Sequence, residues 1–287
     1  MDIADIPIRV IGPGSQAGSN AEGPAYIDMP SDMQQYDAPI MPEPEDVQHL
    51  SGASEAMAFL QGALAAFGDD NAKSLADLTH LDEESRALVN QIIGEGEVSI
   101  TYNGTPQAHV QEAVLAGVWR TFYFDEDGKV AIDLLEVGYV PHIITAENKQ
   151  AQPIDLSQSA ETADMTNALP LLVELDNHCR LFTQDGNPHS INLTLLPLSP
   201  EELVFIDQRL GRGPVGMLSR AYGKCEVIST QCKNVWWVRY YNAMGVLILN
   251  LLEVTGIPQI VAAADEDISD SATRLDELLQ HYWTKSA

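Results

Sequence analysis

The chain contains an internal duplication, and this repeat limits the folds it can adopt. When residues 81–144 are placed over residues 198–261 without a gap, 17 of the 64 positions are identical, where average amino-acid usage gives about four by chance. The identical positions include turn glycines, a tryptophan, a tyrosine and a proline, but no catalytic type of Ser, Cys, His or Asp. The repeat therefore predicts a duplicated scaffold or binding surface and argues against a duplicated active site.

The charge balance narrows the class of partner. The chain has 42 acidic and 15 basic side chains among 287 residues, a formal charge of -27. A field of this sign repels nucleic acids and anionic lipid surfaces and favours basic partners. Residues 1–5 lack the basic start of a signal peptide, and the most apolar stretch, residues 246–254, is too short to span a bilayer. We predict a cytoplasmic protein with no nucleic-acid partner and no membrane insertion.

The repeat and the apolar periodicity predict an α+β fold of two tandem modules, each an antiparallel sheet packed by two helices. An extended arm precedes them and a helix follows them. The predicted boundaries are an acidic, proline-rich arm over 1–50, a first module over 51–145, a linker over 146–166, a second module over 167–264 and a C-terminal helix over 265–287.

The arm has a composition of its own. Residues 1–50 hold nine acidic residues, one basic residue and seven of the sixteen prolines, which disfavours helix and central strand. Sparse apolar residues such as Met29 and Met33 are candidate partner-binding positions. The arm is ordered against the body, waits for a partner, or is disordered, and low hydrophobicity with high net charge favours the last.

Helical and alternating patterns place the elements of both modules. Helices are expected over 54–67, 82–93, 169–182 and 200–210, and the main strands over 97–102, 109–124, 129–137, 227–241 and 246–254. Trp119 and Trp236 occupy equivalent positions of the repeat, and we expect each to lie between the sheet and the helices of its module.

One glycine-rich motif spells a dinucleotide fingerprint without its context. Residues 211–216 read Gly-Arg-Gly-Pro-Val-Gly, but a fingerprint follows a strand and opens a helix. Here a helix comes first, and Pro214 removes an amide that would face the phosphates. We interpret Gly211 as a helix stop and predict no cofactor.

Cysteine and carboxylate positions give no catalytic or metal site. Cys179, Cys225 and Cys232 have no chelating spacing, and the adjacent His178 and Cys179 point about 100° apart on a helix. We expect reduced, buried thiols and no stoichiometric metal. The duplicated Glu136 and Glu253 are interpreted as charges that face solvent from strands, and no residue is assigned a catalytic role.

An aromatic strand is the best candidate for protein recognition. Alternation along residues 235–241 puts Trp236 on one face and Trp237, Arg239 and Tyr241 on the other. The net charge argues against stacking on single-stranded nucleic acid. Because Trp, Tyr and Arg concentrate binding energy at interfaces, the face that bears Trp237, Arg239 and Tyr241 is predicted to bind a partner. The alternative is a second buried face under the helices or the arm.

The chain resembles a known family through an ordered set of motifs. The arm contains Ile6-Pro-Ile-Arg-Val-Ile-Gly-Pro-Gly-Ser-Gln16, Met29-Pro-Ser-Asp-Met33 and Pro42-Glu-Pro-Glu45. The modules share Gly-x-Gly-x-Val, Val-Trp and Leu-Glu-Val blocks that are followed by a proline. Together these are similar to nickel-iron hydrogenase expression and maturation proteins of the HupH, HyaF and HoxQ type.

This resemblance implies a chaperone-like accessory protein and no enzyme. Its partners would be the hydrogenase small-subunit precursor, which carries iron-sulfur clusters, and other maturation proteins. The binding would precede assembly and export. An iron-sulfur carrier or scaffold is the alternative, and a hydrolase or transferase is a third hypothesis.

Overall fold

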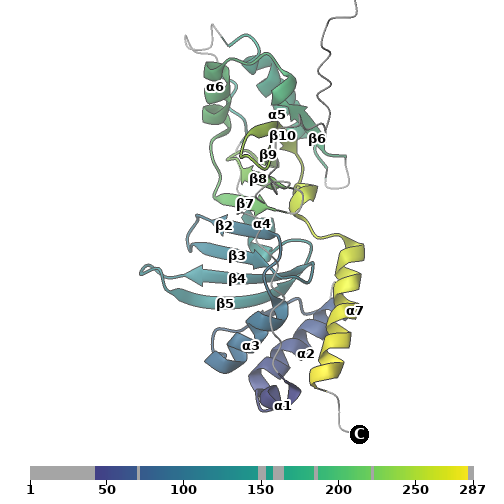
Figure 1. Cartoon of the computed structure of the whole chain (residues 1–287). Helices are drawn as coiled ribbons and strands as arrows, with labels where there is room; N and C mark the ends of the chain where they lie inside the picture. The colour runs from purple at the N-terminus through teal and green to yellow at the C-terminus, as the bar shows by residue number, and fades with distance from the viewer. Residues whose placement is uncertain are drawn as a thin grey trace, which may run out of the picture. The chain divides into compact units, whose positions relative to one another are not determined.

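An antiparallel sheet runs through both modules of the computed structural model (Figure 1). The structure describes residues 43–69, 72–147, 153–157, 165–183, 187–220 and 223–283. Within them the sheet has ten strands in the order β1-β5-β4-β3-β2-β7-β8-β9-β10-β6, so the second half repeats the first in mirror order. The predicted α+β class and duplicated modules are confirmed. Most of the arm, including Met29 and Met33, lies outside the described residues.

The elements of the first module are the helices α1 (Pro44–Val47), α2 (Ser51–Ala65), α3 (Glu83–Ile93) and α4 (His142–Glu147) and the strands β1 (Leu75–Asp77), β2 (Val98–Tyr102), β3 (Ala108–Glu112), β4 (Val118–Phe124) and β5 (Val130–Val137). Those of the second are the helices α5 (Ala168–Leu181) and α6 (Pro200–Leu210), the 3-10 turns η3 (Leu193–Leu195) and η4 (Gln259–Val261), and the strands β6 (His189–Asn192), β7 (Val215–Ser219), β8 (Lys224–Ser229), β9 (Val235–Tyr241) and β10 (Leu247–Val254). The C-terminal helix is α7 (Asp265–Tyr282). None of the helices in these residues combines the length and apolarity needed to cross a membrane.

The two modules meet edge to edge through β2 and β7. These strands pair antiparallel over five residue pairs, and Ile100 stands opposite Met217 at the middle of the ladder. The two residues are equivalent positions of the repeat, 117 apart, and both side chains are buried. The duplication is therefore arranged about a local two-fold relation, and two sheets that the sequence presents as separate become one.

The prediction of one long strand over 109–124 and another over 227–241 is wrong, because a tight turn divides each stretch into two antiparallel strands. Gly117 has φ 78° and Asn234 has φ 61°; the two are equivalent positions, and glycine and asparagine are the residues that adopt this region most readily. The turns separate β3 from β4 and β8 from β9.

The helix-stop interpretation of the glycine-rich motif is confirmed. Gly211 ends α6 with φ 62°, and Gly94 ends α3 with φ 56°. A Cβ on Gly213 would lie 2.6 Å from the carbonyl oxygen of Thr230, and one on Gly96 would lie 2.3 Å from that of Ala113. The motif therefore combines a helix end with a close backbone approach in both modules.

Three apolar clusters stabilise the sheet. The shared tryptophans were predicted to lie under α2, α3, α5 and α6, but they lie on the opposite face of the sheet. One cluster joins α2, α3 and α7 to the first module, and another joins α5 and α6 to the second. Trp119 and Trp236 belong to the third, on the reverse face of the sheet, together with residues of α4 and η4. Their indole N–H groups donate to equivalent backbone carbonyls, those of Gly138 at 2.9 Å and Thr255 at 3.1 Å.

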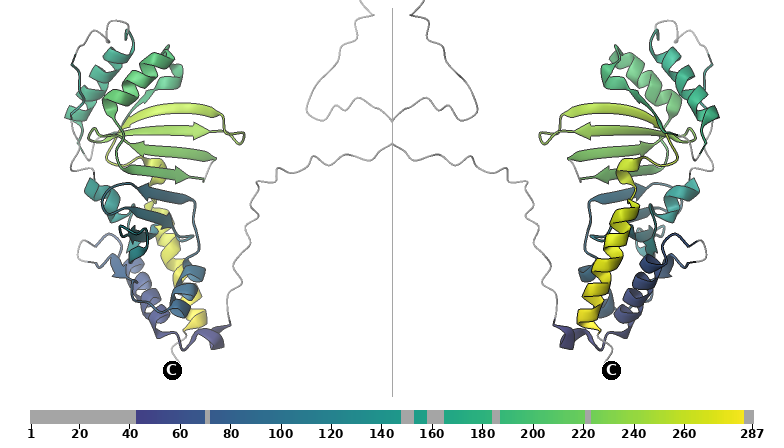
Figure 2. Two further views of the ribbon diagram at one scale, coloured as in Figure 1. Left: turned by 90° about the vertical axis from the view of Figure 1, so that its left-hand side faces the viewer. Right: turned by 90° about the vertical axis from the view of Figure 1, so that its right-hand side faces the viewer.

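The segment that follows each module packs on the other module. Helix α7 follows the second module but runs beside α2 of the first, where Ile268, Leu275 and Leu279 are buried (Figures 1 and 2). Ile154 follows the first module and is buried among residues of α5 and α6. Arg209 of α6 holds this segment through Asp155, at 2.6 Å. These two segments therefore add contacts between the modules to those made by the sheet.

Replacing Ile100 or Met217 by Ala should lower the free energy of unfolding by about 2 to 5 kcal/mol in each case, because each leaves a cavity at the junction of the modules. Urea denaturation followed by circular dichroism should show one transition that moves as a whole. Val130→Ala, at an exposed strand end, is the control and should change the free energy by less than about 0.5 kcal/mol. Two separate transitions would show that the modules fold independently.

Candidate functional site

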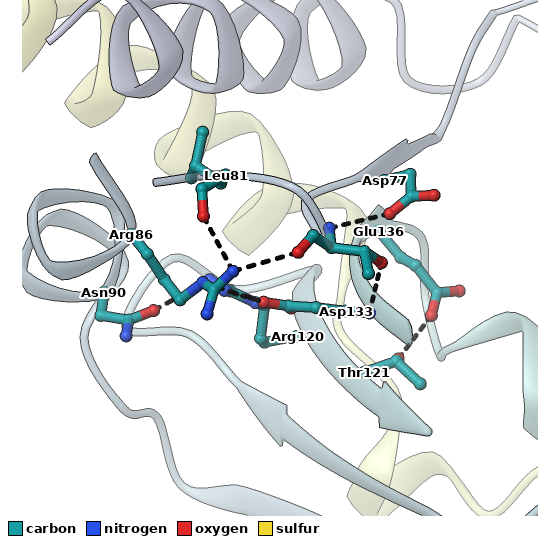
Figure 3. A network of polar contacts seen from close by, with 9 residues as sticks. Asp77, Leu81, Arg86, Asn90, Arg120, Thr121, Asp133 and Glu136 are labelled. Atoms are coloured by element: carbon teal, nitrogen blue, oxygen red, sulfur yellow. Dashed lines mark hydrogen bonds and ion pairs between the residues drawn. The ribbon is translucent and has the colours of Figure 1, made fainter. Parts of the chain in front are cut away.

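A buried ion pair lies between α3 and the sheet of the first module (Figure 3). Arg120 on β4 and Asp133 on β5 are each 3 % exposed. The Arg120 guanidinium donates two hydrogen bonds to the Asp133 carboxylate, one of them 2.6 Å long, and a third to Asn90 of α3 at 2.9 Å. A buried charge pair of this kind is tolerated because its remaining polar atoms are also bonded.

Arg86 extends this network towards the surface. It approaches Asp133 at 3.8 Å and donates to the carbonyls of Thr79 and Leu81 at 3.1 and 2.9 Å. The Thr79 hydroxyl in turn accepts from the backbone N–H of Asp133 at 3.0 Å. The network fixes α3 and the β1–α3 loop on the sheet, so we assign it a structural role.

Trp237 takes the place of Arg120 in the second module, and it is buried rather than exposed. Asn250 replaces Asp133, and its amide oxygen accepts from the Trp237 indole. Trp237 is 5 % exposed and packs under α5 and α6. The alternative of a second buried face is therefore the correct one for Trp237, and its ring is not available as a surface anchor.

Glu136 does not face solvent, contrary to the expectation from sequence. It lies buried on the face that carries Trp119, where its carboxylate accepts from the Thr121 hydroxyl and, at 2.9 Å, from the N–H of His142. His142 is the first residue of α4, so this carboxylate binds the N-terminus of the helix. Glu253 is half-buried, and burial raises its pKa.

Arg239 and Tyr241 continue along β9 from Trp237 and are half-exposed. The Arg239 guanidinium lies over the Trp237 ring, with 4.7 Å to the ring centroid. The Tyr241 hydroxyl donates to Glu226 at 2.8 Å, and Lys224 binds the same carboxylate at 2.7 Å while its ammonium lies 4.8 Å from the Tyr241 ring centroid. Burial and the bond to Glu226 raise the pKa of Tyr241.

These two residues lead to an exposed apolar hairpin end. Met244 is 83 % exposed, Val246 54 % and Ile248 55 %. The equivalent turn of the first module reads Asp125-Glu126-Asp127, whereas this one reads Asn242-Ala243-Met244. We name Arg239, Tyr241, Met244, Val246 and Ile248 the β9–β10 hairpin surface. A largely apolar surface that lacks acidic residues, on a protein of charge -27, is typical of a site that binds another protein.

The three cysteines do not all come together. Cys179 and Cys232 lie with the cluster under α5 and α6, whereas Cys225 belongs to the cluster of Trp119 and Trp236. Burial raises the pKa of Cys179 to about 12 and those of Cys225 and Cys232 to about 11. All three are therefore thiols at neutral pH, and thiolate is the form that binds metals.

One group of possible metal ligands comes together where sequence reasoning did not place it. Glu174 and His178 lie one turn apart on α5, and His189 begins β6. Their ligand atoms all lie within 4.8 Å of one another, and the His189 Nε2 is 3.0 Å from the Glu174 carboxylate. The i, i+4 spacing of Glu174 and His178 was a detectable signal, but their proximity to His189 depends on the tertiary fold.

Glu112 is an ionisable group held in a half-buried position beside the Gly96 approach. Burial and the nearby Glu97 and Asp267 carboxylates raise its pKa to about 7, although the N–H of Val98 donates to it at 3.2 Å. In the second module Ser229 stands at the equivalent position, and its hydroxyl accepts from the equivalent N–H, that of Val215, at 3.0 Å. The scaffold needs an acceptor here but no charge.

The match to a known protein family also occurs twice, once in each module. Residues 51–164 and 165–282 each match a family model described as HupH hydrogenase expression protein, C-terminal conserved region. The chain is 39% identical over 282 residues to the hydrogenase expression/formation protein HoxQ of Cupriavidus necator, with 98% of both chains covered. It is 32% identical to the hydrogenase-1 operon protein HyaF of Escherichia coli, with 95% of both covered. A solved structure, the hydrogenase expression protein HupH from Thiobacillus denitrificans, is 30% identical, covers 39% of this chain and 94% of its own, and has a TM-score of 0.37.

Replacing Asp133 by Ala should lower the free energy of unfolding by about 3 to 5 kcal/mol, because the Arg120 charge would stay buried without its partner. The double change Arg120→Met with Asp133→Leu should cost much less, since both charges leave together. Chemical denaturation of the two variants beside the wild type measures the difference. Equal losses in the single and double variants would contradict the expectation.

Glu112→Gln should change how stability depends on pH. The folded-state pKa of about 7 lies above the ordinary value of 4.5, so the wild type loses stability as pH rises between these values and carries the full penalty above pH 7. The increase in the free energy of unfolding caused by Glu112→Gln should therefore be larger at pH 8 than at pH 4.5, by up to about 2 kcal/mol after solvent screening. Denaturation curves at both pH values test the sign. A gain that does not vary with pH would refute it.

Proposed function

Because this chain belongs to the family of HupH hydrogenase expression proteins, we propose that it is a non-catalytic, chaperone-like protein that binds the small-subunit precursor of a nickel-iron hydrogenase. The relatives are named as hydrogenase expression/formation proteins, so a role in hydrogenase maturation follows from family membership. Binding of the precursor in the cytoplasm, before assembly and export, is the finer proposal.

The β9–β10 hairpin surface is the observation that carries this proposal. Met244 and Ile248 expose apolar side chains at the end of a hairpin whose other copy ends in three acidic residues. Side chains of this kind gain free energy when a partner covers them, about 25 cal/mol per Å² of apolar surface. Arg239 and Tyr241 at the base of the hairpin supply polar groups that orient such a partner.

The charge of the chain supports a partner with basic segments. A formal charge of -27 attracts such a partner over distances of about 10 Å at roughly 0.1 M salt. Precursors that are exported by a twin-arginine signal carry basic residues, so a precursor of this type would be attracted. Raising the salt concentration should slow association more than it speeds dissociation.

The iron-sulfur carrier alternative receives no support from the cysteines. Cys225 lies in a different cluster from Cys179 and Cys232, and burial keeps all three protonated at neutral pH. Cluster binding needs several thiolates that face one another, which these positions do not provide.

Changing Met244 and Ile248 together to Asp should weaken capture of the precursor at least tenfold, because exposed anchors at interfaces contribute about 1 to 4 kcal/mol each. The measurement is co-expression with an affinity-tagged small-subunit precursor, followed by pull-down and quantification of both chains. Tyr241→Ala should weaken capture less, because Tyr241 is only half-exposed and its hydroxyl already donates to Glu226.

The matched control is Val130→Asp with Ile132→Asp, at the equivalent strand of the first module, where both residues are also exposed. This variant should capture the precursor like the wild type. Deleting residues 1–45 in a parallel experiment tests whether the arm, with Met29 and Met33, contributes. If the variant at Met244 and Ile248 and the control variant at Val130 and Ile132 lose capture equally, the precursor does not bind at the β9–β10 hairpin surface. No capture by the wild type would refute the proposed function.

A further inference from the structure

Two histidines and a glutamate from α5 and β6 lie close together in the second module, with their possible ligand atoms within 4.8 Å of one another. The rings of His178 and His189 lie face to face, with centroids 3.4 Å apart and planes 5° from parallel. Glu174 lies one helical turn before His178 on the same side of α5. The antiparallel register of β6 with β10, in which His189 stands opposite Val254, holds His189 against this side of the helix.

This set of donors has a defined chemical preference. Two imidazole nitrogens and one carboxylate oxygen suit a first-row transition-metal dication such as Zn²⁺ or Ni²⁺, whereas Mg²⁺ prefers oxygen ligands throughout. Three protein ligands leave a further coordination position for water or another ligand. Glu174 also lines a groove of about 490 Å³ that contains Asn167, Ser190 and Pro197, so the carboxylate side of the group can be reached from solvent.

Packing does not account for the group. By register, Ser74 of the first module stands at the position of His189, since the Ser74 carbonyl accepts from Val137 just as His189 pairs with Val254. The first module therefore forms the same strand pairing without an imidazole. A half-buried stack of two histidines beside a carboxylate is an addition to the second copy of the scaffold.

We infer that Glu174, His178 and His189 form a binding site for a transition-metal dication of the zinc or nickel type, in which one imidazole turns out of the stack so that a nitrogen of each ring points at the ion. The site is independent of the cysteines, whose spacing led us to expect no stoichiometric metal. It is also independent of the β9–β10 hairpin surface, so the test of the metal site does not depend on the outcome for the proposed function.

Isothermal titration of the full chain, purified without a polyhistidine tag, tests the inference with ZnCl₂ and NiCl₂. The wild type should bind one equivalent of Zn²⁺, and His178→Gln, His189→Gln and Glu174→Gln should each weaken binding at least tenfold. His109→Gln, which changes an exposed histidine on β3, and Cys179→Ser should bind like the wild type. An excess of MgCl₂ should not compete.

A second measurement keeps the result independent of variant folding. In ¹H–¹⁵N spectra of the wild type, the ring signals of His178 and His189 should shift on addition of one equivalent of Zn²⁺, while that of His109 stays unchanged. Absence of saturable binding by the wild type would overturn the inference. So would unweakened binding in the double variant His178→Gln with His189→Gln, unshifted ring signals of these two residues, or loss of binding in Cys179→Ser alone.

Discussion

The antiparallel pairing of β2 with β7 is the interaction on which the rest of the structure depends. It places Ile100 opposite Met217 and turns two five-stranded sheets into one. A module by itself would leave an unpaired strand edge and the apolar face of its shared tryptophan without the partner module's half of the cluster. Unpaired edges of this kind invite aggregation. Joining the edges therefore satisfies backbone hydrogen bonds and buries one continuous apolar face at the same time.

The two copies keep the shared framework and differ where the framework does not need a particular side chain. Trp119 and Trp236 donate to equivalent carbonyls, whereas the equivalent positions 120 and 237 hold an ion-paired arginine and a tryptophan. Both solutions fill the space under a helix and satisfy their polar atoms. A buried ion pair and an indole with an amide partner are physically interchangeable here because each completes its own hydrogen bonds.

Among the described residues, both features proposed to bind other molecules, the β9–β10 hairpin surface and the histidine–glutamate group, lie in the second module. The hairpin end is apolar there and acidic in the first copy, and His189 stands where the first copy has Ser74. The first module instead receives α7 from the end of the chain, which covers α2. Duplication thus allows one copy to strengthen the fold while the other carries surfaces that stability alone would not select.

The sequence by itself determined the duplication, the α+β class, the four main helices of the modules and the glycine helix ends, because these depend on local periodicity and backbone conformation. It also placed Trp236 and Trp237 on opposite faces of a strand. Only the tertiary structure decided which face is covered by helices, because alternation fixes relative and not absolute orientation. The same holds for the β2–β7 junction, the exchange of segments between modules and the convergence of His189 with Glu174. Each of these joins residues distant in the chain, and no local pattern encodes such a contact.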